Sequence, residues 1–140
     1  MPDFVKAMVN NALGNGTPMT VAYVDSEGRP SLSLRGSTQA YSDTQLSIWL
    51  RTAERGMAKS LEANPNVSLL YRDQKTRSTL IFQGKGHIEN DEDVRRRVWE
   101  LAPEVEQNHD PNRETGVALI IDLDRVQGFT PRGGVRMTRP

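Results

Sequence analysis

The sequence of 140 residues has no cysteine, no excess charge of either sign and no long apolar run, and each absence narrows its function. Without cysteine there are no disulfides, thiolate metal ligands, iron–sulfur clusters or cysteine nucleophile, and the composition fits a reducing compartment. Its 18 basic and 18 acidic residues cancel, whereas nucleic-acid binders usually carry a basic field. No apolar run approaches the ~20 residues that span a bilayer, and the N-terminal residues lack the pattern of a signal peptide. We therefore expect one soluble cytoplasmic domain, residues 1–140, that binds neither nucleic acid nor membrane.

The motifs of common catalytic sites are missing as well. There is no GxxxxGK[ST] phosphate loop, no GxGxxG after a strand and no GxSxG nucleophile elbow. The two histidines, His87 and His109, lack metal-ligand spacing, and we expect a hydrogen-bonded strand position for the first and a solvated loop position for the second. Helix capping explains the acidic run at residues 91–93, and a solvated helix face explains the arginines at residues 95–97. No catalytic residue and no metal site is assigned.

Hydrophobic periodicity predicts three helices and six strands. Helices are expected over residues 4–13, 57–61 and 91–101, the last with Asn90 as its N-cap. Strands are expected over residues 19–24, 31–35, 46–51, 67–71, 80–88 and 117–126. In the fifth strand, Gly84 and Gly86 predict a bulge or a close backbone approach. Residues 103–113 are interpreted as a polar loop and residues 131–140 as a basic tail. Six strands in antiparallel hairpins are best closed into a barrel, because closure removes exposed edges.

Polar side chains that suit an anionic, aromatic ligand are distributed over three consecutive elements. Arg35 and Ser37 follow one strand, Trp49 and Arg51 lie on the next, and Lys59 lies on the short helix after it. A phosphate group binds arginine, lysine and hydroxyl donors, and a flat ring binds in an apolar slot beside an aromatic residue. The same pattern also suits surface ion pairs made by the two arginines and a core position for the tryptophan.

An ordered set of short segments gives the chain a family resemblance. The sequence resembles the pyridoxamine-5′-phosphate-oxidase-like, FMN-binding split-barrel flavoproteins over about residues 4–127. The resemblance implies a mainly β (α+β) fold, a six-stranded antiparallel split β-barrel with short flanking helices. It also implies a homodimer with two cofactor sites between the subunits. The segments that carry it are VAYV (21–24), GRP (28–30), SLRGS (33–37), LSIW (46–49), AKSL (58–61), NPNVSL (64–69) and QGKG (83–86).

The resemblance also implies which residues contact the cofactor. In the oxidase itself a serine-arginine-lysine triplet before the helix binds the phosphate, and here these positions are Arg55, Gly56 and Met57. An arginine-glutamine pair of the oxidase corresponds to two hydroxyl residues on the long strand. The expected cofactor contacts are Arg35 (phosphate or ribityl chain), Ser37, Ile48 and Trp49 (beside the ring), Arg51 and Thr52 (near the phosphate), Arg55, Lys59, Ser78 and Thr79.

These observations favour an FMN-dependent oxidoreductase acting on a small-molecule substrate, because the flavin carries the chemistry and no protein nucleophile is needed. A deazaflavin coenzyme is the second cofactor considered and haem the third, since haem prefers an axial histidine. The alternative function is a non-catalytic split-barrel module that binds a flavin, a deazaflavin or haem, and a third interpretation is a β protein without cofactor. The arginine-rich tail either closes over the cofactor, binds an anionic substrate or is disordered.

Overall fold

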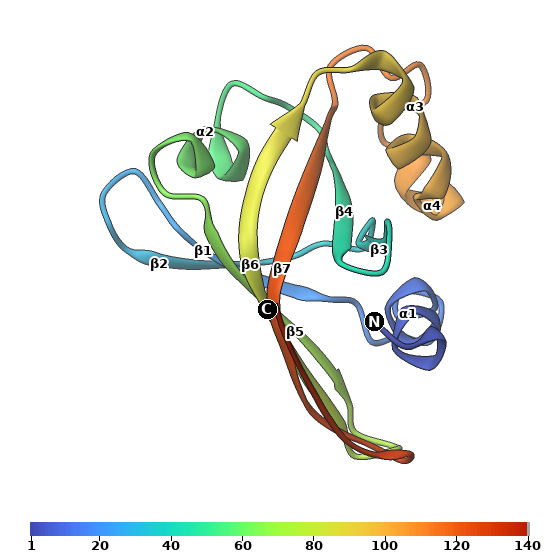
Figure 1. The fold of residues 1–140 in the computed structure, drawn as a ribbon. Helices are drawn as coiled ribbons and strands as arrows, with labels where there is room; N and C mark the ends of the chain where they lie inside the picture. Colours follow the sequence, from blue (N-terminus) through green and yellow to red (C-terminus); the bar gives the residue numbers. More distant parts are fainter. Residues whose placement is uncertain (140) are drawn as a thin grey trace.

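Eight strands form one antiparallel sheet in the computed structural model, which describes residues 1–139. Along the sheet the strand order is β2-β1-β5-β6-β7-β4-β3, with β8 also paired to β7. The sheet curls around an apolar interior (Figure 1), so the expected split-barrel class is confirmed. The strands are β1 (Thr20–Val24), β2 (Pro30–Leu34), β3 (Gln39–Ala40), β4 (Gln45–Leu50), β5 (Asn66–Asp73), β6 (Ser78–Glu89), β7 (Val117–Thr130) and β8 (Gly133–Thr138).

The helices lie at the margins of the barrel. They are α1 (Asp3–Asn10), α2 (Gly56–Ala63), α3 (Glu92–Leu101) and α4 (Glu104–Gln107). Helix α2 packs against β1 and β6, whereas α3 packs against β4 and β7 on another side of the molecule (Figure 1). No helix in residues 1–139 is both long and apolar enough to span a membrane.

Strand β4 separates two apolar clusters, because alternate residues of a strand point to opposite faces. Leu46, Ile48 and Leu50 belong to the main cluster inside the barrel. Trp49 points the other way, into a smaller cluster that includes Val98 of α3. The two faces of one six-residue strand thus hold the barrel interior together and attach α3 to its outside.

The sheet has eight strands where six were expected, because β3 and β8 were not predicted. Four local expectations also needed correction. The N-cap of α3 is Asp91 and not Asn90, since the Asp91 carboxylate accepts hydrogen bonds from Asp93 N and Val94 N. The first helix ends at Asn10, three residues earlier than expected, and continues as turns. The segment expected to be a loop contains α4. The segment expected to be a tail contains β8, whose six residues pair with β7; Pro140 lies outside the described residues.

The expectation for Gly84 is confirmed. The pairing of β6 with β7 shifts register between Gln83 and Gly84. A Cβ atom on Gly84 would overlap the carbonyl group of Asp122 on β7, so the backbones approach too closely for any side chain.

The outer surface of the sheet carries an unusual set of exposed apolar side chains, which we call the outer apolar face. Leu34 lies opposite Thr20, Thr20 also lies opposite Leu70, and Leu70 lies opposite Ile81, so these side chains share one face across four strands. Large exposed apolar patches on a soluble protein mark interaction sites. The members are Leu32 (74% exposed), Leu34, Leu70, Ile81 and Phe129 (72% exposed).

Candidate functional site

A cavity of about 380 Å³ lies where the ends of β2 and β4 meet the start of α2, and three arginines line it. This volume is within the usual range for small-molecule sites. We call it the arginine pocket. Its walls come from residues 34–37 at and after the end of β2, residues 49–52 at the end of β4, residues 55–58 at the start of α2, and Glu106 of α4.

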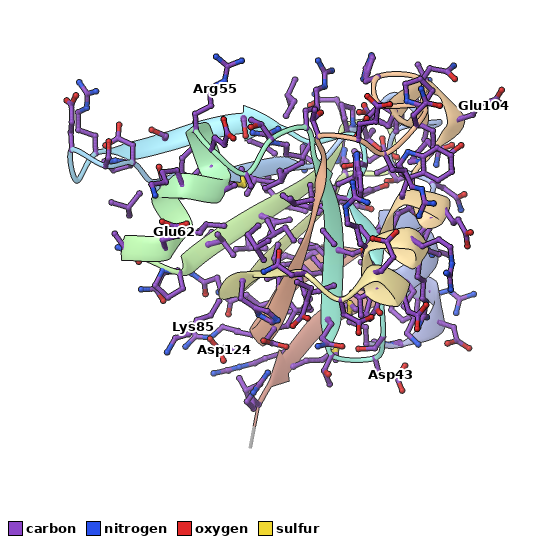
Figure 2. All side chains as sticks on the ribbon, turned by 90° about the horizontal axis from the view of Figure 1, so that it is seen from above. Asp43, Arg55, Glu62, Lys85, Glu104 and Asp124 are labelled. Carbon is purple, nitrogen blue, oxygen red and sulfur yellow. The ribbon has the colours of Figure 1, made fainter. Side chains whose placement is uncertain are left out.

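The three arginines of the pocket form no direct ion pair with a carboxylate in residues 1–139. Arg35 Nε donates to Ser33 Oγ at 3.1 Å, and Arg51 Nη2 donates to His109 Nδ1 at 2.8 Å. Arg55 projects from the N-terminal end of α2 (Figure 2). Within residues 1–139, no carboxylate oxygen lies within 4.0 Å of a nitrogen of Arg35, Arg51 or Arg55. The alternative interpretation of Arg35 and Arg51 as surface ion-pairing residues is therefore wrong for the described part of the chain.

The start of α2 adds further positive potential to the pocket. Arg55 is the N-cap, and no side chain caps the helix there. The next residue, Gly56, has φ +65, which favours glycine. The first N–H groups of a helix have no partner within it, and with the helix dipole they attract anions. The pocket therefore combines guanidinium groups with unpaired backbone donors, the combination that suits a phosphate group.

A buried carboxylate fixes the tryptophan wall of the pocket. Asp110, which is 7% exposed, accepts hydrogen bonds from Trp49 Nε1 (3.3 Å), Gly116 N (2.9 Å) and Glu114 N (3.1 Å). The guanidinium group of Arg95 lies 5.2 Å from the centre of the Trp49 ring, a cation–π distance. Trp49 is thus both a buried residue of the smaller apolar cluster and a lining residue of the pocket.

Ser37 has a structural contact that the sequence did not indicate. Its hydroxyl accepts from Trp49 N at 3.0 Å and donates to Trp49 O at 3.1 Å. The hydroxyl therefore closes the loop after β2 onto β4 and holds Arg35 and Trp49 at the same cavity.

The loop around α4 places Glu106 in the lining of the pocket and His109 against the side chain of Arg51. Because an arginine can only donate, His109 Nδ1 is the acceptor in its contact with Arg51 Nη2. The same Nδ1 lies 3.5 Å from Glu106 Oε2. His109 was expected to be solvated and is partly so, but one ring nitrogen is occupied by Arg51.

Arg35 is the most enclosed of the three arginines. Burial lowers the pKa of its guanidinium group from the ordinary value, while Tyr23 raises it, Arg51 lowers it and Glu106 raises it. An arginine remains protonated under all such influences, so Arg35 is a permanent, partly desolvated cation. Desolvation strengthens its attraction for an anion.

Six of the ten residues expected to contact a cofactor line the arginine pocket, and four do not. Ile48 is fully buried in the main core, and Lys59 Nζ forms an ion pair with Glu62 Oε2 at 2.9 Å, near the other end of α2. Ser78 and Thr79 begin β6 at the opposite end of the barrel, where Thr79 lines a different cavity with Phe129 (Figure 1). The six that converge are Arg35, Ser37, Trp49, Arg51, Thr52 and Arg55.

The sequence did not identify Glu106 or Asp110 as part of the site. Both lie in the segment interpreted as a polar loop. No local pattern marks an acidic loop residue that will be buried, because its burial depends on where the loop folds back on the barrel. One hypothesis for the arginine-rich tail was that it closes over the cofactor. Strand β8 instead lies along β7 and contributes no residue to the arginine pocket of its own chain.

Several solved structures are similar to this protein over almost its whole length. A protein related to general stress protein 26 from Clostridium acetobutylicum, of the pyridoxinephosphate oxidase family, has a TM-score of 0.70 at 14% identity, with 99% of this chain and 96% of that chain covered. A pyridoxamine 5′-phosphate oxidase-related, FMN binding protein from Nostoc punctiforme has a TM-score of 0.72 at 15% identity, with 94% and 84% covered. HupZ of Group A Streptococcus has a TM-score of 0.72 at 15% identity, with 96% and 98% covered. These likenesses show a shared fold.

Sequence comparison gives the family directly. Comparison with curated proteins yields no match. The sequence profile of pyridoxamine 5′-phosphate oxidase matches residues 5–127, which is most of the chain and includes every residue that converges on the arginine pocket. The chain belongs to the pyridoxamine 5′-phosphate oxidase family.

Proposed function

We propose that the protein is a flavin-dependent oxidoreductase that binds FMN, with the FMN phosphate in the arginine pocket. The observation that carries the proposal is the convergence of Arg35, Arg51 and Arg55, none of them ion-paired within residues 1–139, on the uncapped start of α2. A phosphomonoester carries a charge of about −1.5 to −2 at neutral pH. The donor set of the pocket therefore fits the phosphate of FMN.

Different side chains would bind different parts of FMN. Arg35, Arg51 and Arg55 would hold the phosphate, and the Thr52 hydroxyl would donate to it. Trp49, fixed by Asp110, would supply an aromatic wall for the rest of the ligand. Bound FMN supplies hydride or electron transfer, which agrees with a pocket whose lining residues include no nucleophile paired with a base.

We further propose that the protein acts as a homodimer through the outer apolar face. Leu34 belongs to that face and also lines the arginine pocket. A second copy seated on the face would therefore form part of the pocket wall, so the cofactor would lie at the subunit interface. The small-molecule substrate would reach the flavin from the side that neither subunit covers.

The colour of the purified protein and an FMN titration test the cofactor. Arg35→Ala and Arg51→Ala should each weaken FMN binding by about tenfold to a hundredfold, the loss expected for a charge-assisted hydrogen bond. Arg96→Ala is the matched control, because Arg96 is exposed and paired with Asp93 at 3.1 Å, far from the pocket lining. Absence of a bound chromophore, together with no binding of FMN or of a deazaflavin coenzyme, would support the β protein without cofactor.

Turnover separates the enzyme from the binding module. Bound flavin that bleaches with a reductant and reoxidises while it reduces an electron acceptor supports the oxidoreductase. Stable binding without turnover supports the module. A parallel titration with a deazaflavin coenzyme and with haem decides between the three cofactors.

Sedimentation analysis tests the homodimer. Leu70→Glu places a charge in the middle of the outer apolar face, and burying an unpaired charge is strongly unfavourable. We expect a dimer for the unmodified protein, and for Leu70→Glu a monomer with weakened FMN binding. Val105→Glu is the control, because Val105 is an exposed apolar residue of α4 outside the face. A monomeric unmodified protein at micromolar concentration would contradict the homodimer.

A further inference from the structure

We propose that Glu106 is a specificity-determining residue that acts as an internal counter-ion and weakens the hold of the arginine pocket on phosphoryl groups, so that a phosphorylated ligand exchanges. The inference rests on the proposed function, because it concerns the same pocket. Among the described residues that line the pocket, Glu106 is the one acid beside three arginines. The lining therefore carries two positive charges and not three.

The Glu106 carboxylate lies against the backbone of the loop after β2. Its side chain is 24% exposed. A Cβ atom on Gly36 would overlap Glu106 Oε1, so the carboxylate lies directly on the backbone of the loop after β2. The other oxygen, Oε2, faces His109 Nδ1 at 3.5 Å. The carboxylate thus lies against the loop that carries Arg35 and within the lining of the pocket.

The carboxylate acts on the arginines through its charge and not through a direct ion pair. Its charge opposes the pKa lowering of Arg35, which places it within the electrostatic reach of that guanidinium group. No oxygen of Glu106 lies within 4.0 Å of an arginine nitrogen in residues 1–139. Arg35 is therefore attracted to Glu106 without a direct ion pair. The arginine donors that Ser33 and His109 do not use are left for a ligand.

Two negative groups in one pocket repel each other, and this repulsion depends on the charge of the ligand. For unit charges several ångströms apart at a partly exposed site, the interaction changes binding by about tenfold. This repulsion should weaken the binding of a phosphomonoester, whereas it should not affect riboflavin, which carries no phosphate. Glu106 thus lowers the preference of the pocket for phosphorylated over unphosphorylated ligands and speeds the release of the former.

Calorimetric titration of Glu106→Gln with FMN, riboflavin and inorganic phosphate tests the inference. We expect FMN and phosphate to bind about tenfold more tightly than to the unmodified protein, with riboflavin unchanged within twofold. Glu104→Gln is the matched control, since Glu104 lies on the same short helix but projects from the edge of the molecule (Figure 2) and does not line the pocket. Glu106→Ala, which removes the same charge, should reproduce the gain for both anions.

Three outcomes would overturn the inference. Weaker binding of both FMN and riboflavin to Glu106→Gln would mean that the carboxylate accepts from a ligand hydroxyl. Equal gains in Glu104→Gln and Glu106→Gln would mean that net charge alone matters. Unchanged binding of both anions would mean that Glu106 exerts no repulsion. If no flavin binds to any variant but phosphate binds more tightly to Glu106→Gln, the flavin proposal fails and the role of Glu106 stands.

Discussion

Removing the Asp110 carboxylate should destabilise the fold more than removing any exposed acid. In Asp110→Ala, three donors lose their acceptor: Trp49 Nε1 and Gly116 N, which are buried, and Glu114 N, which is partly buried. A buried donor without a partner costs about 1–3 kcal/mol, and water can reach the partly buried one. Two buried donors at about 2 kcal/mol each give a loss of about 4 kcal/mol in the free energy of unfolding. This loss is a large fraction of the free energy of unfolding of a typical domain, which is about 5–15 kcal/mol.

Asp110→Asn separates the hydrogen bonds from the shape of the side chain. The amide oxygen can keep the two buried donors that share Oδ2, while the amide nitrogen faces Glu114 N. We therefore expect a loss of only about 1 kcal/mol for this variant. The control is Asp124→Ala, because Asp124 is half exposed and its ion pair with Arg139 spans 3.7 Å. Such a pair contributes about 0–1 kcal/mol.

Urea unfolding followed by tryptophan fluorescence measures these differences, provided that the slope with denaturant stays constant. The expected order of stability loss is Asp110→Ala, then Asp110→Asn, then Asp124→Ala. If Asp110→Ala loses no more than the control, the buried carboxylate does not hold the Trp49 wall, and the account of the pocket given above is wrong.

Three further measurements check other parts of the structure. Gly116→Ala should cost about 2 kcal/mol or more in urea unfolding, because the new Cβ would overlap the Trp49 ring; an unchanged midpoint would contradict the packing. The hydrogen bond from Lys6 lowers the pKa of Asp43 below its ordinary value of 3.8, so its contribution to stability is present above pH 3.8 and is lost as the pH falls below it. Acid unfolding of Asp43→Asn should therefore show a shallower loss of stability in that range, and an identical pH profile would count against the pair. Truncation of residues 133–140 should lower the melting temperature, because it removes β8 and its ladder to β7; an unchanged melting temperature would mean that this strand adds nothing.

The strands could be predicted where polar and apolar residues alternate between clear turns. Leu46, Ile48 and Leu50 gave the barrel face of β4, and the structure places all three in the main core. The short β8 was not predicted, because Val135 and Met137 are its only large apolar residues beside two glycines, one arginine and one threonine. Its stability depends on pairing with a long neighbour, which is a tertiary effect that local pattern does not encode.

The candidate site could be predicted only in part, for a similar reason. Arg35 and Arg51 each follow a strand, and the family resemblance places both near the cofactor phosphate. Their convergence on one pocket could therefore be predicted. Ser78 was expected near them, but position along a long strand does not tell which end of the barrel a residue occupies. Glu106 reaches the pocket and His109 reaches Arg51 because the loop around α4 folds back on the barrel. No local pattern in a polar segment indicates such a fold.

The double position of Leu34 bears on how ligand binding would depend on protein concentration. The same side chain is exposed on the outer apolar face and lines the arginine pocket. In the proposed homodimer a partner subunit on this face would alter the pocket, so self-association and ligand binding would be thermodynamically linked, and each would change the other by the same factor. The apparent affinity for a ligand would then rise with protein concentration, and dilution would release the ligand as well as the partner subunit.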